Sequence, residues 1–372
     1  MDPPPDGTVS VDDLFEDMEE RASAGDVAAQ LELARICDED GKNEQALVWR
    51  RRAAESGEAT AKNALARHLV SQPRYDVFEG IRWALEAIHS GEAEAAHLLA
   101  VVVAEGLGIP KSWNGALDYL QYAAERGHAL TKGELGALAG HWPLARALVS
   151  GEATPAQDWH TLRRGIDVGA LLAIPRPRII SETPRMAVAE KFLSASACDW
   201  LVARARPQIR RAAVFDVENG SSQLLDSRSN TGAYLNVAEM DMITVATRAR
   251  MAALSGLPVL GFEDSAALHY GVGEEYRPHF DFLDPAQAMA QEIASGGQRV
   301  ATVLIYLNDG YDGGEIDFPA AQRRYKGRKG DALIFWNVTR EGQPDRLTLH
   351  AGLPPTRGEK WLFSQWIRQR VN

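Results

Sequence analysis

The amino-acid sequence predicts a two-part protein, in which an N-terminal α-helical repeat solenoid is followed by a double-stranded β-helix, or jelly roll, with flanking helices. Three observations support this fold class: a repeat in the first half, a proline-rich segment after it, and short β-rich segments in the second half. The chain has 372 residues and 45% of them are apolar, so it can bury at least one sizeable core. This length is typical of two or three domains.

Glycines mark the repeat in the first half. Gly25, Gly57, Gly91 and Gly127 are separated by 32, 34 and 36 residues. A leucine follows each glycine by eight residues, and an alanine follows it by two or four. A period of this length, rich in Ala and Leu, is typical of stacked helix-turn-helix pairs. We therefore expect the glycines to form left-handed turns and the alanines to let paired helices approach closely.

Aromatic residues accompany the repeat, and we interpret them as packing residues between the helices. They stand eight residues before the last three glycines, at Trp49, Trp83 and Tyr119. Two of the units read ALVWRRRAAESGEATAKNALARHL and ALDYLQYAAERGHALTKGELGALAG. These units resemble Sel1-like repeats, a branch of the tetratricopeptide superfamily, and the resemblance covers about residues 21 to 140. It implies a helical surface that recruits a protein or peptide partner.

Prolines mark the change between the two halves of the chain. Pro155, Pro175, Pro177 and Pro184 lie in a stretch with little sustained helical periodicity, which indicates a linker. We therefore predict four parts: a flexible N-terminus (1–20), the helical repeats (21–150), the linker (151–185) and a second domain (186–372).

Charge, cysteine content and apolar runs argue against several functional classes. The formal net charge of -11 repels a phosphate backbone, so we expect neither nucleic acid nor an anionic membrane as partner. Cys37 and Cys198 are the only cysteines, too few for a disulfide scaffold or a thiolate zinc site. The N-terminus lacks the features of a secretory signal, and no apolar run approaches the roughly 20 residues that span a bilayer. We therefore expect a cytoplasmic protein, and the sequence is compatible with a monomer.

Short β-rich segments favour a sheet sandwich in the second half. After a helical stretch around 195–205, four segments have the β-branched and aromatic content, and the length, of strands. They are AALHYGV, RVATVLIYLN, DALIFWN and KWLFSQWI. Asp312-Gly313-Gly314-Glu315 is a turn signal between two of them. Several such strands in succession predict a jelly roll.

A candidate metal site lies within this frame. His279 and Asp281 are two residues apart, so in an extended strand both side chains project from the same face. Such a pair occurs by chance in many proteins, and a third ligand is needed. His350 is the only histidine that follows, and its spacing allows a later, adjacent strand. Two imidazoles and one carboxylate form the facial triad of iron(II) oxygenases, which leaves positions for a bidentate co-substrate and dioxygen.

A second candidate residue is Lys360, ten residues after His350 at the start of the last predicted strand. A lysine ammonium is a point charge suited to holding a terminal carboxylate of a co-substrate. The alternative is a solvent-facing lysine at a strand start.

Taken together, the second half resembles the catalytic domain of prolyl 4-hydroxylases, within the 2-oxoglutarate dioxygenase superfamily. The resemblance runs from about Ala187 to the C-terminus. The matching blocks, in order, are LHYGVGEEYRPHFDF, GQRVATVLIYLND, GGEIDFP, KGDALIFWN and DRLTLHAGLPPTRGEKWLFSQWI.

The resemblance implies a role for each of ten residues. It implies that Fe(II) is held by His279, Asp281 and His350, and that the C5 carboxylate of 2-oxoglutarate is bound by Lys360 with Tyr270. Thr302 falls where a hydroxyl of the co-substrate pocket is expected. Facing the peptidyl substrate would be Tyr276, Arg299 and Trp366, with a contribution from Glu263. Dioxygen is the second co-substrate, and ascorbate is the expected reductant.

Two residues depart from the family pattern. Ile316 stands where the GGETxFP block has Thr, and Thr348 replaces the usual Ser two residues before the distal histidine. Neither change removes a ligand, so both bear on the substrate rather than on activity. The polar segment FDVENGSSQLLDSRSNTGAYL stands where the family has a mobile substrate lid, and we interpret it as a lid; the alternative is a plain loop.

Three functions are compatible with these features. The first is a hydroxylase of peptidyl proline with the repeats recruiting the protein target. The second is a hydroxylase of a free amino acid or natural product on the same scaffold. The third is a scaffold protein with a vestigial oxygenase fold, against which the retention of the triad and Lys360 argues. Tyr276, Arg299 and Trp366 favour the first function over the second.

Overall fold

The computed structural model describes residues 11–72, 76–212, 214–216, 221–223, 227–284 and 290–369. The chain divides into two compact units, each considered by itself below. The first comprises Met1–Leu135 and Leu144–Arg164, and the second Gly136–Pro143 and Gly165–Asn372. No helix among the described residues combines the length and the apolar character needed to cross a membrane.

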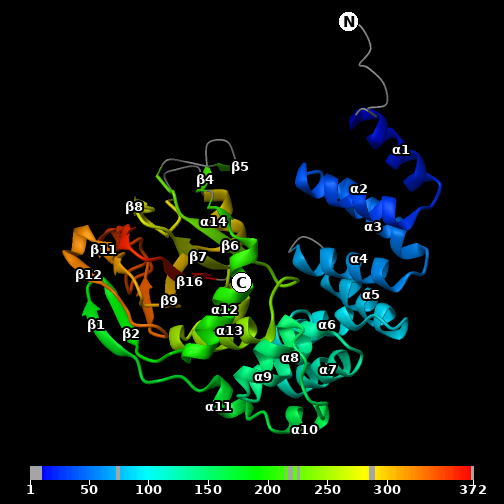
Figure 1. Cartoon of the computed structure of the whole chain (residues 1–372). Helices are drawn as coiled ribbons and strands as arrows, with labels where there is room; N and C mark the ends of the chain where they lie inside the picture. Colours follow the sequence, from blue (N-terminus) through cyan, green and yellow to red (C-terminus); the bar gives the residue numbers. More distant parts are fainter. Residues whose placement is uncertain are drawn as a thin grey trace, which may run out of the picture. The chain divides into compact units, whose positions relative to one another are not determined.

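The first unit is built from helices that follow one another along the chain (Figure 1), and the helices α1 to α7 have 13 residues each. The helices are α1 (Val11–Ser23), α2 (Val27–Glu39), α3 (Asn43–Glu55), α4 (Ala59–Ser71), α5 (Val77–His89), α6 (Ala93–Glu105), α7 (Trp113–Glu125), α8 (Ala129–Leu138), α9 (Trp142–Ser150) and α10 (Trp159–Arg164). From α1 to α7, each helix contacts the next one. This arrangement confirms the predicted helical solenoid.

The repeat glycines form the corners between helices, as predicted. Gly25, Gly57, Gly91 and Gly127 have φ values of 99°, 92°, 94° and 94°. A Cβ atom at any of these positions would meet nothing within 4 Å. The glycine is therefore required by the left-handed backbone and not by lack of space.

Two of the repeat aromatics pack between helices, also as predicted. Trp49 lies against a cluster formed by Ala22, Ala29 and Leu33. Trp83 lies against a cluster that includes Leu47 and Leu65 of the preceding helices. The small alanines of these clusters leave room for the two rings.

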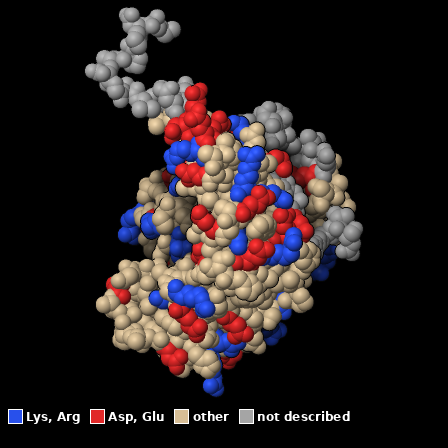
Figure 2. Space-filling model, turned by 90° about the vertical axis from the view of Figure 1, so that its right-hand side faces the viewer, with Lys and Arg blue, Asp and Glu red and all other residues tan. Residues whose placement is uncertain are grey.

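Charged residues of both signs lie on the face of the molecule shown in Figure 2. On the face shown in Figure 2, lysine and arginine side chains alternate with aspartate and glutamate side chains. In α2, Arg35 pairs with Glu32 at 2.6 Å and with Glu39 one helical turn away. Such exposed pairs contribute little to stability individually.

The second unit begins with elements inside the segment that we predicted as a linker. That segment contains α10 of the first unit and, in the second, α11 (Val168–Leu172) and strand β1 (Arg178–Glu182). β1 pairs with β2 (Arg185–Ala189) and forms the edge of the main sheet.

Two antiparallel sheets form the body of this unit. The main sheet has the order β1-β2-β13-β9-β16-β7-β6-β3, and the smaller one has the order β12-β11-β14-β8. Their other strands are β3 (Arg210–Arg211), β6 (Thr231–Leu235), β7 (Ser265–Tyr270), β8 (Tyr276–His279), β9 (Arg299–Tyr306), β11 (Ile316–Phe318), β12 (Arg323–Tyr325), β13 (Ala332–Trp336), β14 (His350–Gly352) and β16 (Lys360–Arg368). Two further pairs are β4 (Val214–Asp216) with β5 (Ser221–Gln223), and β10 (Asp312–Gly313) with β15 (Pro355–Arg357). This arrangement confirms the predicted jelly roll.

Helices accompany the sheets of the second unit. The α-helices are α12 (Ala195–Ala205), α13 (Met242–Ser255) and α14 (Ala290–Gly296), and the short 3-10 helices are η1 (Arg206–Gln208), η2 (Val259–Gly261), η3 (Pro319–Ala321) and η4 (Arg346–Thr348). α12 occupies the stretch where a helix was predicted.

The core of this unit lies between the two sheets. Leu304 and Tyr306 of β9 project from one face because they are two residues apart, and they pack with Ile316 and Phe318 of β11. The opposite face of β9 is buried too: Val303 and Ile305 have no exposed area. α12 covers part of that face, since Cys198 Sγ lies 3.9 Å from the Tyr306 carbonyl. Burial on both faces explains why these strands read as continuous apolar runs.

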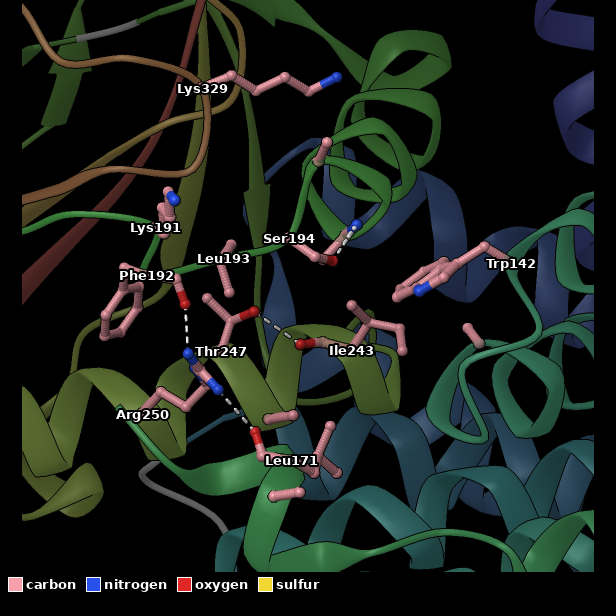
Figure 3. Close-up of a pocket in the computed structure, with 15 residues that line it drawn as sticks. Trp142, Leu171, Lys191, Phe192, Leu193, Ser194, Ile243, Thr247, Arg250 and Lys329 are labelled. Carbon is pink, nitrogen blue, oxygen red and sulfur yellow. Dashed lines mark hydrogen bonds between the residues drawn. The ribbon is translucent and has the colours of Figure 1, made fainter. Parts of the chain in front are cut away.

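Arg250 ties the start of the second unit to α13. Its guanidinium donates hydrogen bonds to the carbonyls of Leu171, at 2.9 Å, and of Phe192 (Figure 3). It lies in the wall of a cavity of about 490 Å³ whose other lining side chains include Ile243 and Thr247 of the same helix. Through Arg250, the two hydrogen bonds link α11 and the loop before α12 to α13.

Candidate metal centre

The pairing of β8 with β14 brings two of the predicted ligands together. In this antiparallel pair His350 lies directly opposite His279, and their ring centroids are 4.3 Å apart. Asp281 follows β8 by two residues, so it returns to the face that carries His279. Side chains from one strand, its continuation and the neighbouring strand therefore converge on one point.

The distances at this point suit a shared ion. His279 Nε2 lies 3.6 Å from Asp281 Oδ1, and His350 Nε2 lies 3.6 Å from Asp281 Oδ2. Ligand atoms that are each about 2 Å from one ion lie about 3 to 4 Å apart. Within the described part of the chain, this is the one group of three or more His, Cys, Asp or Glu residues able to hold a metal ion.

Hydrogen bonds set the tautomer of both imidazoles. His279 Nδ1 lies 2.8 Å from the Arg277 carbonyl, and His350 Nδ1 lies 3.0 Å from the Thr348 carbonyl. A carbonyl oxygen only accepts hydrogen bonds, so Nδ1 carries the proton in both rings. In the neutral form of each ring Nε2 carries the lone pair, and Nε2 is the atom that faces Asp281.

The charge states at this site are those a metal requires. Burial by itself would raise the pKa of Asp281, but His350, His279 and the Thr302 hydroxyl together hold that pKa well below its usual range. Burial, helped by His279, lowers the pKa of His350 to about 4. A carboxylate beside a neutral imidazole is therefore the resting state near neutral pH, and both can bind a cation without losing a proton.

Lys360 is fully buried at the start of β16, which contradicts the alternative of a solvent-facing lysine. Its Cα partner on β7 is Tyr270, and its Nζ lies 4.6 Å from the centre of that ring. Nζ has no hydrogen-bond partner, and burial lowers the pKa of Lys360 to about 7, although Glu315 acts in the opposite direction. An unpaired amine buried in this way is costly unless an anion joins it.

Tyr270 and Tyr276 line a narrow cleft over the triad. A Cβ at Gly352 would lie 3.2 Å from the Tyr270 hydroxyl, so glycine leaves that hydroxyl its space. The Tyr276 ring stacks on His279 at 3.5 Å between centroids. The free volume of the cleft is about 30 Å³, room for about one water. Side chains such as Tyr276 must therefore move before a larger molecule reaches the triad.

Thr302 lies next to a predicted ligand. Its hydroxyl donates a hydrogen bond of 2.7 Å to Asp281 Oδ2 and accepts one of 3.0 Å from Asn337 Nδ2. Its single proton is thus committed to Asp281. We predicted a hydroxyl of the co-substrate pocket here, and in the structure that hydroxyl donates to the carboxylate of Asp281.

Glu263, Arg299 and Trp366 form a second cluster beside the triad. The Arg299 guanidinium donates to both carboxylate oxygens of Glu263, at 2.6 and 2.8 Å, and lies 3.8 Å from the Trp366 ring centre. Burial would raise the pKa of Glu263, but Arg299 and Arg368 keep it below its usual value. Trp366 pairs with Thr302 across β16 and β9 and also lines the narrow cleft, so the cluster borders the triad.

Arg228 belongs to the same cleft, and sequence analysis missed it. It is 3% exposed, its guanidinium lies 4.5 Å from the Tyr276 ring centre, and its Nε donates to Asn230 Oδ1 at 3.0 Å. It lies within the polar segment that we interpreted as a lid. In the sequence, Arg228 is a single basic residue among small polar ones, and such a pattern does not indicate a binding site. Other parts of that segment, 217–220 and 224–226, lie outside the described residues.

Comparisons with known proteins agree with this geometry. Residues 265–368 match the 2OG-Fe(II) oxygenase superfamily. Prolyl 4-hydroxylase 1 of Arabidopsis thaliana is 35% identical over 210 residues, which cover 53% of this chain and 73% of that protein. Prolyl 4-hydroxylase 2 of the same plant is 35% identical over 209 residues, covering 50% of this chain and 68% of that protein.

Two solved structures are also similar to parts of the chain. The viral collagen prolyl hydroxylase of Paramecium Bursaria Chlorella virus-1 is 27% identical, with a TM-score of 0.38, covering 49% of this chain and 95% of that one. A Sel1 repeat protein from Oxalobacter formigenes is 27% identical, with a TM-score of 0.29, covering 33% of this chain and 97% of that one.

We predict that Asp281→Ala weakens Fe(II) binding by more than ~100-fold, because losing a ligand should cost more than the 10–100-fold typical of a supporting residue. Anaerobic titration calorimetry measures this directly. Asp199→Ala is the matched control, since it removes an exposed carboxylate of the same unit that pairs with Lys329, and it should bind Fe(II) like the parent. Equal affinities for all three proteins would rule out this carboxylate as a ligand.

Proposed function

Because the chain belongs to the prolyl 4-hydroxylase family of 2-oxoglutarate and iron(II) dependent oxygenases, we propose that it hydroxylates a peptidyl proline and that its helical repeats recruit the protein target. The observation that carries this proposal is the convergence of His279, Asp281 and His350 within one unit that also buries the unpaired amine of Lys360. Ascorbate as the reductant and a cytoplasmic setting belong to the same proposal.

The residues fit the groups that the family uses. Two imidazoles and one carboxylate form a donor set suited to Fe(II), with positions left for further ligands. When bound, iron supplies the oxidation in which dioxygen gives one oxygen atom to a substrate C–H bond and one to 2-oxoglutarate, which leaves as succinate and carbon dioxide. In this proposal His279, Asp281 and His350 hold the ion on one face.

Lys360 would hold the distal carboxylate of 2-oxoglutarate, with Tyr270 beside it. An ammonium inside an apolar wall attracts a carboxylate more strongly than the same ammonium in water would. Ile316 and Leu304 line the cleft near the triad and exclude water from it. In this proposal the protein's own residues bind and orient the reacting groups and keep water away from them.

The cluster of Glu263, Arg299 and Trp366, with Tyr276 and Arg228, would face the peptide. Arg299 is held by both oxygens of Glu263, so its orientation does not depend on the substrate. Trp366 and Tyr276 offer ring faces, which suit the flat, apolar edge of a proline ring. A pre-organised surface of this kind supports a peptide as substrate.

Mass spectrometry tests the proposed reaction. The purified chain is incubated with Fe(II), ascorbate and 2-oxoglutarate, with and without proline-containing peptides or lysate protein. We expect succinate release coupled to a mass increase of one oxygen on a proline residue. Coupled oxidation of a free amino acid alone would favour the small-molecule alternative. No coupled turnover by an iron-loaded chain would favour a scaffold without catalysis.

We predict that binding of 2-oxoglutarate takes up a proton above neutral pH. The pKa of Lys360 is about 7 in the absence of an anion, and a bound carboxylate raises it because the charged form gains a partner. Affinity is therefore greatest below pH 7 and falls as pH rises from 7 toward the pKa of the complex. Calorimetry at pH 8 in buffers of different ionisation enthalpy measures the proton uptake.

Lys360→Met is the control for this prediction. It should lose the proton uptake and weaken 2-oxoglutarate binding by about 2 to 5 kcal/mol, because a buried carboxylate is left without its partner. Fe(II) binding should be unchanged. Proton uptake that persists in Lys360→Met would assign it to another group.

Truncation tests the recruitment by the repeats. A chain that begins at Gly136 keeps the whole second unit, and with it every residue assigned to iron, co-substrate or peptide. We expect its kcat on a saturating short peptide to stay near the parent value and its KM for the full protein target to rise, since tethering raises the local substrate concentration without touching the chemistry. Equal KM values for the full target would show that the repeats do not recruit it, whereas loss of peptide turnover would mean that they support the catalytic fold.

A further inference from the structure

We propose that Asn337 is a positioning residue that orients Asp281 through the hydroxyl of Thr302. This inference deepens the proposed function and rests on it, because it takes His279, Asp281 and His350 as the iron ligands. Asn337 directly follows β13 and ends the matching block KGDALIFWN, but the sequence pattern assigned it no role.

The backbone of Asn337 is fixed from both sides. Its N–H donates to the Val300 carbonyl at 2.9 Å, and its carbonyl accepts a hydrogen bond of 2.9 Å from the Asp345 N–H. The residue has no exposed area. The direction in which its side chain leaves the strand is therefore set by two hydrogen bonds and by packing.

The side chain begins a chain of hydrogen bonds with one possible polarity. Asn337 Nδ2 lies 3.0 Å from Thr302 Oγ1, which lies 2.7 Å from Asp281 Oδ2. An amide nitrogen can only donate, so the Thr302 oxygen accepts that bond. The single hydroxyl proton must then go to Asp281. These three side chains are at most 3% exposed, so water does not compete for the bonds.

The opposite orientation of the Asn337 amide would disrupt this chain of hydrogen bonds. It would turn Asn337 Oδ1 toward the hydroxyl, and two acceptors would compete for one proton. The ionised carboxylate of Asp281 therefore selects the orientation in which the amide donates. In return, the chain fixes the rotation of the carboxylate about its Cβ–Cγ bond, which decides where its oxygens lie relative to the two imidazoles.

The backbone of Asn337 also leads to His350. Asp345, whose N–H donates to the Asn337 carbonyl, accepts two hydrogen bonds at its own carbonyl oxygen. Both come from Thr348: the backbone N–H lies 3.0 Å away and the hydroxyl lies 2.6 Å away. The Thr348 carbonyl is the partner of His350 Nδ1. One buried residue is thus linked to two of the three predicted ligands, to Asp281 by its side chain and to His350 by its main chain.

A residue of this kind acts on metal binding and not on folding alone. Residues that orient metal ligands typically contribute 10–100-fold in metal affinity. At this position an aspartate would place a second buried carboxylate near Asp281. A leucine would leave the Thr302 hydroxyl without the donor that directs it. Asparagine supplies a hydrogen-bond donor without adding a charge.

A double-mutant cycle in the full chain tests the proposal. We expect Asn337→Leu and Thr302→Val each to weaken Fe(II) binding by about 10- to 100-fold, and the double variant to bind no more weakly than Thr302→Val, because the amide acts only through the hydroxyl. Thr302→Ser keeps the hydroxyl and should restore affinity to near the parent value. The visible absorption of bound Co(II), which reports coordination geometry, should change in the Leu and Val variants and return in Ser.

Thr247→Val is the matched control. Its hydroxyl is equally buried but donates only to the Ile243 carbonyl within α13, so its loss should lower stability and leave both metal readouts unchanged. If Asn337→Leu does not fold, Asn337→Ala takes its place, and the comparison of Thr302→Val with Thr302→Ser decides on the hydroxyl. Additive losses in the double variant, or parent-like binding by both single variants, would overturn the proposal. A parent chain that binds no Fe(II) would instead overturn the proposed function.

Discussion

The register of β8 against β14 is the constraint on which the second unit depends. It places His350 opposite His279, although the two residues are far apart in sequence, and β14 in turn is held by β11. A shift of one residue would turn either imidazole to the other face of the smaller sheet. The core between the sheets, with Ile316 and Phe318 of β11 packed on β9, therefore has a functional consequence: it holds the register that brings the triad together.

The site concentrates groups that an ordinary core would avoid. Lys360 is buried without a partner, and Asp281 is an ionised carboxylate that is 3% exposed. Asp281 is stabilised by the imidazoles and the Thr302 hydroxyl, whereas Lys360 is left for an incoming anion. Departures from good packing and full hydrogen bonding are typical of functional sites, where the missing partner is a ligand. Both residues face the cost of burying a charge: protein groups offset it for Asp281, and an incoming anion would offset it for Lys360.

Local patterns predicted a large share of this protein. The spacing of Gly25, Gly57, Gly91 and Gly127 indicated the helical corners because left-handed backbone strongly favours glycine. The pair His279 and Asp281 was recognisable because a strand repeats its faces every two residues. Short-range geometry of this kind depends on residues that are close together in the sequence. The segment predicted as a linker contains β1, which pairs with β2, and no local pattern shows that pairing.

Thus the sequence by itself determined the two fold classes, the nature of the candidate ligands and the family resemblance, because each depends on residue type and spacing along the chain. Only the tertiary structure decided that Thr302 donates to Asp281, that Asn337 directs that hydroxyl, and that Arg228 covers Tyr276. These contacts join residues from different strands and loops, and their hydrogen-bond polarity depends on which groups burial leaves without water. The physical reason is that these partners become neighbours only when the core folds, and residues far apart along the chain leave no regular spacing in the sequence that would show it.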